Sequence, residues 1–147
     1  MANMMLNELV QKVRRYTRDT TGSLFTQEDI VDFCNEAIQR MKQVIIELKN
    51  MDNLKSNTDE VTVLPYQYQH LISVYSASRC FSQDEQQYQA TTYMNEFETK
   101  LNELLLAIRN GDIILYDKDG NEIKPEGLGG IDYVRDVYFR NFNTEEL

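Results

Sequence analysis

Residues 116–128, YDKDGNEIKPEGL, carry side-chain oxygens at the first, third and fifth positions counted from Asp117. That spacing is typical of the start of an EF-hand calcium loop. The loop also needs Gly at its sixth position and a bidentate Glu at its twelfth, where this chain has Glu122 and Leu128. The Asp119-Gly120 pair, between short β-prone runs, instead predicts the turn of a β-hairpin, because Gly tolerates positive φ. We expect a hairpin and no metal ion, with an incidental weak ion site as the alternative.

Groups suited to enzyme catalysis are scarce. His70 is the only histidine, so a metal site built from several histidines is impossible, and its flanks YQYQHLIS contain no nucleophile signature. Neither GxGxxG nor a Walker sequence occurs. We therefore predict that the chain is not an enzyme and binds no cofactor, and that His70 lies partly exposed on a helix.

The 147 residues suit one domain, and their net charge is −9. Such a charge disfavours tight non-specific binding to nucleic acid, which depends on Lys and Arg neutralising phosphates. Four basic residues nevertheless cluster near the start of the chain: Lys12, Arg14, Arg15 and Arg18. They are interpreted as a solvated helix face, with a phosphate-binding face as the alternative.

The two cysteines, Cys34 and Cys80, each lie in an apolar periodic stretch, which predicts buried, reduced thiols. The N-terminal sequence MANMMLNELVQK does not read as a signal peptide, because Asn and Glu interrupt it. No apolar stretch approaches the ~20 residues that a membrane-spanning helix needs. We expect a soluble protein that has no membrane anchor.

Apolar residues recur with helical spacing in four segments, approximately residues 3–18, 26–48, 66–81 and 82–109. Thr26 can cap the second helix by accepting the N–H of Asp29. Leu64-Pro65 suits the start of the third helix, and residues 82–85, SQDE, have the composition of a cap for the fourth. The expected fold is an all-α four-helix bundle over residues 1–110.

Residues 111–147 differ from this bundle in composition. They are expected to form the small β-hairpin and then an extended C-terminal arm. The arm begins after Gly127, Gly129 and Gly130, which we interpret as a hinge. Its core, residues 131–142 (IDYVRDVYFRNF), contains four aromatic residues and two Arg, the residue types that are enriched at interface hot spots. The pattern does not decide between strand and helix.

Five residues of the arm are predicted to contact a partner protein or a neighbouring subunit: Tyr133, Val134, Tyr138, Phe139 and Phe142. The alternative is an arm folded back on its own bundle.

The order of four segments resembles the head–tail connector (adaptor) proteins of tailed bacteriophages: LNELVQKVRRYTRDT, LFTQEDIVDFCNEAIQRM, VTVLPYQYQHLISVYSASRCF and QATTYMNEFETKLNELL. The shared features are a first helix ending near Asp19, residues 35–37 (Asn-Glu-Ala) in the second helix, and Leu64-Pro65 before the third. The likeness covers roughly residues 4–108. An aromatic residue, often Trp, precedes the second helix in that family, and Phe25 takes its place here; the hairpin and the arm have no matching positions.

The resemblance implies a structural virion protein, made in the host cytoplasm and located at the head–tail joint. Such proteins form a homo-oligomeric ring, commonly dodecameric, beneath the portal protein. They provide the docking surface for tail or nozzle proteins and part of the DNA conduit. An acidic subunit suits a conduit, because genomic DNA would pass it without tight binding.

Two other functions stay open. The chain could be a helical partner-binding adaptor or regulatory protein outside a virion. It could instead be a DNA-binding protein that uses the basic residues of its first helix.

Overall fold

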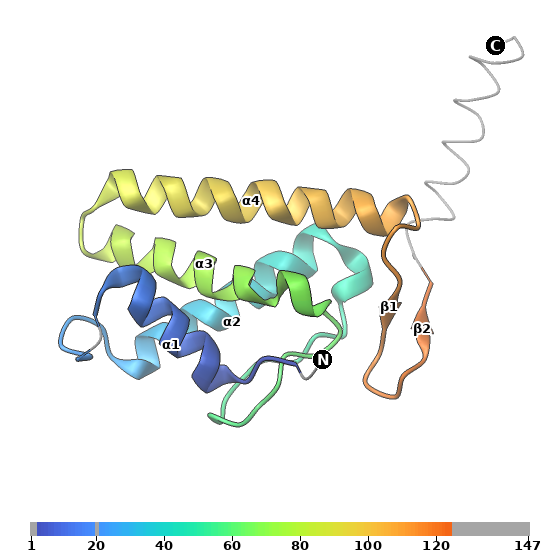
Figure 1. Cartoon of the computed structure of the whole chain (residues 1–147), viewed down its shortest axis with the longest axis horizontal. Coiled ribbons are helices and arrows are strands. Elements are labelled where there is room, and N and C mark those ends of the chain that lie inside the picture. The colour runs from blue at the N-terminus through green and yellow to red at the C-terminus, as the bar shows by residue number, and fades with distance from the viewer. Residues whose placement is uncertain (1–2, 20, 125–147) are drawn as a thin grey trace, which may run out of the picture.

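The computed structural model describes residues 3–19 and 21–124, and within them the chain forms four α-helices, a short 3₁₀ helix and a two-stranded antiparallel sheet (Figure 1). The elements are α1 (Leu6–Thr17), α2 (Gln27–Val44), η1 (Ile46–Leu48), α3 (Tyr66–Gln83), α4 (Gln87–Arg109), β1 (Leu115–Tyr116) and β2 (Glu122–Ile123). The expectation of four helices and a small hairpin is confirmed.

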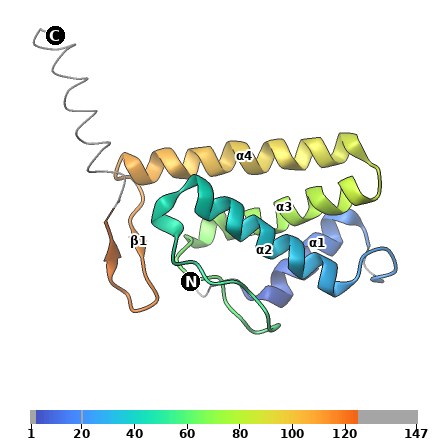
Figure 2. The same ribbon diagram turned by 180° about the vertical axis from the view of Figure 1, so that it is seen from behind.

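Helix α3 occupies the centre of the fold and packs against α1, α2 and α4 (Figures 1 and 2). The surrounding helices turn one apolar face toward it, as their helical spacing predicts. Leu9 of α1, Ile38 of α2 and Phe97 of α4 are fully buried in one shared core. Leu115 of β1 belongs to the same core, so the hairpin packs onto the helical body.

Three buried serines on α3 connect it to its neighbours. A buried hydroxyl needs a hydrogen-bond partner, because an unpaired one loses its contacts with water without replacement. Each serine donates to a backbone carbonyl of a different helix: Ser73 to Leu9 of α1 at 2.9 Å, Ser76 to Ile30 of α2 at 3.3 Å, and Ser78 to Ala90 of α4 at 2.6 Å. The small serine side chains therefore allow α1, α2 and α4 to pack closely against α3, and their hydrogen bonds fix the positions of these helices.

Helices α1, α3 and α4 end in the same backbone arrangement, the Schellman motif, whose key residue adopts positive φ. Gly111 takes that position after α4 with φ 81°, as the sequence predicts. Arg18 and Glu85 take it after α1 and α3, with φ 59° and 60°. In α3, the Gln86 N–H donates to the Phe81 carbonyl at 2.8 Å. Residues 82–85, predicted to cap α4, are thus the end of α3 and the turn that follows it.

Helix α2 ends earlier than its apolar spacing predicts. The spacing continues to Leu48, but the helix ends at Val44, and Ile45 is extended before η1 begins. Ile45 and Leu48 are nevertheless fully buried. The break turns Glu47 inward, so a tertiary contact overrides the helical periodicity here.

That contact is an ion pair between Glu47 of η1 and Arg109 at the end of α4. The guanidinium donates twice, Nε to Oε2 at 2.8 Å and Nη2 to Oε1 at 3.0 Å. The Glu47 side chain is 0% exposed and that of Arg109 is 19% exposed. The pair fixes the end of α4 from which the hairpin departs.

We expect Arg109→Ala to lower the free energy of unfolding by about 3–5 kcal/mol, because it leaves the Glu47 carboxylate buried without a partner. Urea unfolding followed by circular dichroism measures the loss. Arg40→Ala is the matched control: Arg40 makes the same two-bond contact with Glu98 of α4, but both side chains are about 40% exposed. Its loss should not exceed about 1 kcal/mol. Equal losses of unfolding free energy in the two variants would contradict the idea that burial makes the Glu47–Arg109 pair more important.

Candidate functional site

A cleft of about 640 Å³ lies between the hairpin and the segment that leads into α3. Residues 62–66 form one wall, and Ile114 with residues 116–118 forms the other. Tyr66, Ile114 and Tyr116 leave 40%, 51% and 52% of their surfaces exposed. Apolar side chains from both walls therefore face solvent across the cleft, although the residues lie about 50 positions apart in the chain.

The wall opposite the hairpin contains a strained residue. Val63 has φ 71°, a conformation that costs a β-branched residue free energy. The Leu64 N–H donates to the Thr62 carbonyl at 2.7 Å, which closes a γ-turn around Val63. Such a turn persists only where its surroundings hold it in place.

Gln69 of α3 supplies that support. Its side chain is fully buried, and its amide nitrogen donates to the Leu64 carbonyl at 2.8 Å and to Asn3 Oδ1 at 3.0 Å. Its amide oxygen accepts the Met4 N–H at 2.7 Å. One glutamine thus joins the N-terminal segment, the γ-turn and the central helix, and it holds this wall of the cleft in shape.

The hairpin wall is formed by β1, whose residues alternate in exposure. Leu115 is buried in the core, whereas Ile114 and Tyr116 face solvent. Within the turn, the Asp117 Oδ1 accepts the N–H groups of Asp119 and Asn121, both at 2.9 Å. Gly120 has φ 84°, so the predicted hairpin turn is confirmed.

The register of the hairpin leaves an open edge on β1. The Asp117 N–H donates to the Asn121 carbonyl, so these two residues are a hydrogen-bonded pair. Pairs alternate along an antiparallel ladder, so the next pair, Tyr116 and Glu122, is a non-bonded one. The N–H and C=O of Tyr116 therefore point away from β2. Figure 1 shows β1 on the side of the hairpin nearer the helical body.

An exposed ion pair joins the hairpin tip to the loop that follows η1. Lys118 Nζ lies 2.9 Å from Asp52 Oδ2, and both side chains are more than half exposed. The hydrogen bond to Asp52 raises the pKa of Lys118. Exposed pairs contribute little to stability, so the apolar contacts of Leu115 and Ile123 with the core hold the hairpin more firmly than this pair does.

The remaining sequence candidates lie apart from the cleft. Cys34 and Cys80 are buried as predicted, and burial raises the pKa of each thiol to about 12. His70 is half-buried on α3, and burial lowers its pKa. In residues 3–19 and 21–124, no three His, Cys, Asp or Glu side chains are grouped to hold a metal ion. No helix of that part is long and apolar enough to cross a membrane.

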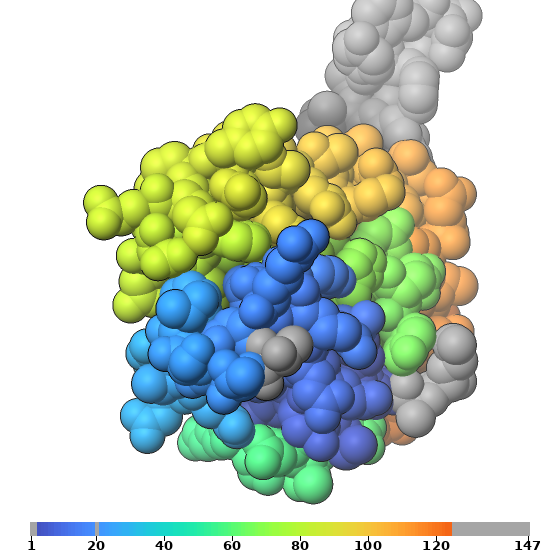
Figure 3. Space-filling model, turned by 60° about the vertical axis from the view of Figure 1, so that its left-hand side comes forward, coloured from blue at the N-terminus to red at the C-terminus, as the bar shows by residue number. Residues whose placement is uncertain are grey.

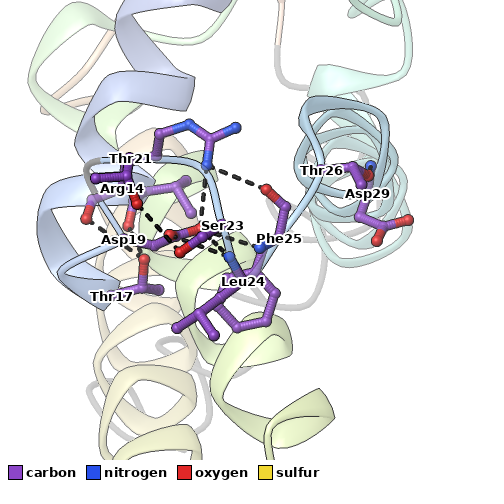
Figure 4. A network of polar contacts seen from close by, with 10 residues as sticks. Arg14, Thr17, Asp19, Thr21, Ser23, Leu24, Phe25, Thr26 and Asp29 are labelled. Carbon is purple, nitrogen blue, oxygen red and sulfur yellow. Dashed lines mark hydrogen bonds and ion pairs between the residues drawn. The ribbon is translucent and has the colours of Figure 1, made fainter.

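Helix α1 and the segment that follows it lie next to each other on the face shown in Figure 3 (blue). One basic residue of α1 is already engaged: Arg14 Nη1 contacts Asp19 Oδ2 at 3.2 Å and donates to the Phe25 carbonyl at 3.1 Å (Figure 4). Arg15 and Arg18 are exposed. Arg14 is therefore engaged in holding the loop. Fewer of the clustered cations are then available to bind the phosphates of a nucleic acid.

Asp19 is the centre of this network. Its buried carboxylate accepts the Leu24 N–H at 3.2 Å and the Phe25 N–H at 3.0 Å (Figure 4). Burial alone would raise the pKa of Asp19. The backbone N–H groups of residues 23–25 and the Arg14 guanidinium outweigh burial and hold the pKa below its usual range. Asp19 thus closes the loop between α1 and α2.

Sequence reasoning placed the partner contacts at Tyr133, Val134, Tyr138, Phe139 and Phe142 and the hinge at Gly127, Gly129 and Gly130. All of these lie outside the described residues. It missed the cleft formed by Tyr66, Ile114 and Tyr116. The sequence carries no signal for it, because Ile113 to Tyr116 is an unbroken apolar run and only the structure shows that Leu115 is buried while Ile114 and Tyr116 are exposed.

No protein-family model matches the chain, and neither curated proteins nor solved structures give a significant match.

We expect Asp19→Asn to lower the free energy of unfolding at pH 7 by about 3 kcal/mol, because it removes a buried charge that accepts several hydrogen bonds. The pKa of Asp19 in the folded state lies below its ordinary value of 3.8. The contribution of the carboxylate is therefore complete above that value and is lost as the pH falls through the folded-state pKa.

Urea unfolding of both proteins, at pH 7 and in steps below pH 4, measures the difference. It should shrink as the pH falls. A difference that stays constant down to the lowest pH would show that the charge of Asp19 is not what stabilises the loop.

Proposed function

We propose that the chain is a structural virion protein: a ring-forming head-to-tail connector (adaptor) of a tailed bacteriophage. In this proposal, residues 1–110 form a four-helix bundle that serves as the connector domain. The ring binds beneath the portal protein, offers a docking surface to tail or nozzle proteins, and forms part of the DNA conduit. The chain has no enzymatic activity in this role, and its arm contacts the portal or a neighbouring subunit.

The observation that carries the proposal is the cleft beside the hairpin, whose walls expose Tyr66, Ile114 and Tyr116. The chain continues from this end of the molecule into a segment rich in aromatic residues and Arg. A subunit that has a receptor surface and a separate inserting segment can form head-to-tail contacts, and such contacts close into rings. The order of the four helices supports the same function, because it agrees with the order that the connector resemblance implies.

Charge also favours a conduit subunit. The net charge is −9, and Arg14, one of the four clustered cations, is held in the loop network. A ring built from acidic subunits repels phosphate, so DNA passes through without being retained. Weak contacts between subunits and portal add up through ring symmetry.

Native mass measurement with the portal protein encoded in the same genome tests the proposal. The expected product is one high-order ring of the chain on the portal ring, and deletion after Gly130 should weaken it. The intact chain is the control. A one-to-one complex would favour a partner-binding adaptor outside a virion, and a genome that encodes no portal would overturn the proposal.

DNA binding separates the connector from a DNA-binding protein. We expect the chain to bind duplex DNA weakly at low salt. Its affinity for DNA should change little when Arg15 and Arg18 are both replaced by Gln. Fluorescence anisotropy over a salt series measures it. A DNA-binding protein would instead lose affinity steeply with salt, with a slope that decreases by about one for each phosphate contact removed.

A further inference from the structure

The cleft between residues 62–66 and β1 has the chemistry of a binding site for an extended peptide. Its walls expose Tyr66, Ile114 and Tyr116 to solvent. The N–H and C=O of Tyr116 point away from β2, so β1 has hydrogen-bonding groups available along that edge. A strand edge beside apolar side chains is the arrangement by which proteins bind peptides through β-strand addition.

The rim of the cleft carries negative charge. Glu60 and Asp117 both line it, and Glu60 is exposed. The cation on the same rim, Lys118, is paired with Asp52. A peptide that suits this site therefore combines aromatic side chains with positive charge.

Residues 131–142 of this chain contain aromatic and Arg side chains in a repeated pattern, and Asp132 and Asp136 bring the net charge of the segment to zero. Tyr133 is followed two positions later by Arg135, and Tyr138 two positions later by Arg140. Residues two apart lie on the same face of an extended strand. In an extended segment, each Tyr and the Arg two positions later can therefore face the exposed apolar side chains and the carboxylates of the cleft together. Asp136 shares the face of Tyr138 and Arg140, whereas no Asp shares the face of Tyr133 and Arg135.

We propose that residues 131–142 of a second copy of the chain occupy this cleft and add a strand to the open edge of β1. The contact is the joint between adjacent subunits, and in this sense it rests on the proposed ring. It is heterologous, because the cleft of one copy receives the segment of the next, so it propagates around a closed ring.

A second copy fits better than the chain's own segment. The described chain ends after β2, which lies on the far side of β1 from the helical body (Figure 1). Residues 125–130, which span at most about 20 Å, would have to pass around the base of the hairpin. A segment that arrives from a neighbour has no such constraint.

Thiol cross-linking between differently tagged full-length copies tests the proposal. One copy carries Ile114→Cys and the other Tyr138→Cys, and a short bismaleimide joins thiols that lie close together. The native thiols do not interfere, because Cys34 and Cys80 are buried and their pKa values are about 12. The control replaces Ile114→Cys by Tyr88→Cys, an exposed position at the start of α4, at the opposite end of that helix from the hairpin.

We expect a cross-linked dimer of the two tags in the Ile114→Cys mixture, well above the Tyr88→Cys control. A third protein carries Ile114→Cys and Tyr138→Cys in the same chain. If its cross-links form only within single chains, the chain's own segment fills the cleft and the proposal is overturned. Yields no higher than the control would overturn it as well.

Sedimentation equilibrium of full-length variants gives a second measurement. Tyr116→Ser should weaken self-association by about thirtyfold, as expected for truncation of an aromatic hot-spot residue. Leu106→Ser, at an exposed position on α4, is the matched control and should leave it unchanged. Equal behaviour of the two variants would contradict the cleft assignment.

The outcomes also separate this proposal from the proposed function. A ring on the portal without the Ile114–Tyr138 cross-link would leave the connector function standing and reject the cleft contact. The cross-link without portal binding would establish the contact between copies and reject the connector.

Discussion

The arrangement of the helices depends on the need to pair buried hydroxyls on one central helix. Ser73, Ser76 and Ser78 leave α3 in three directions, and each finds a backbone carbonyl on a different neighbour. Apolar contacts alone tolerate sliding, because the hydrophobic effect has no direction. A buried hydroxyl allows little sliding of one helix along another, because its hydrogen bond weakens steeply with distance and angle. The serines therefore fix the helices around α3 where apolar packing would leave them free to shift.

The same reasoning extends from the core to the cleft. Gln69, one turn before Ser73 on α3, uses its amide to hold the strained turn at Val63. The Glu47–Arg109 pair fixes the end of α4, and Leu115 fixes the hairpin that follows. Both walls of the cleft are thus attached to the helical body by buried groups. The exposed Tyr66, Ile114 and Tyr116 are held in place before any partner arrives, which lowers the entropic cost of binding.

The sequence predicts the helices well because each buries an apolar stripe whose period is local. Leu9, Ile38 and Phe97 follow from spacing alone. The helix ends are harder to predict: Arg18 and Glu85 adopt the positive φ that composition assigns to glycine. The apolar pattern of α2 continues past Val44, because Ile45 and Leu48 remain buried after the helix has ended. The inward turn of Glu47 needs Arg109, which lies 62 positions away.

The cleft could not be predicted from the sequence, because its walls come from separate parts of the chain. Residues 62–66 and 116–118 meet only after α3 and α4 have folded between them. The predicted contact residues of the arm lie outside the described residues, so their part in the site stays a prediction. What the structure adds is the cleft itself, with Tyr66, Ile114 and Tyr116 exposed on its walls.

The length of α4 has a consequence for how several partners can be accommodated. Its 23 residues span about 34 Å as one helix. The loop closed by Asp19 lies near one end of this helix, and the hairpin lies at the other (Figures 1 and 2). Two partners bound at these ends would have binding sites separated by about the length of the helix. Because α4 is continuous between them, a tilt of the subunit would displace both ends together and would keep their spacing constant.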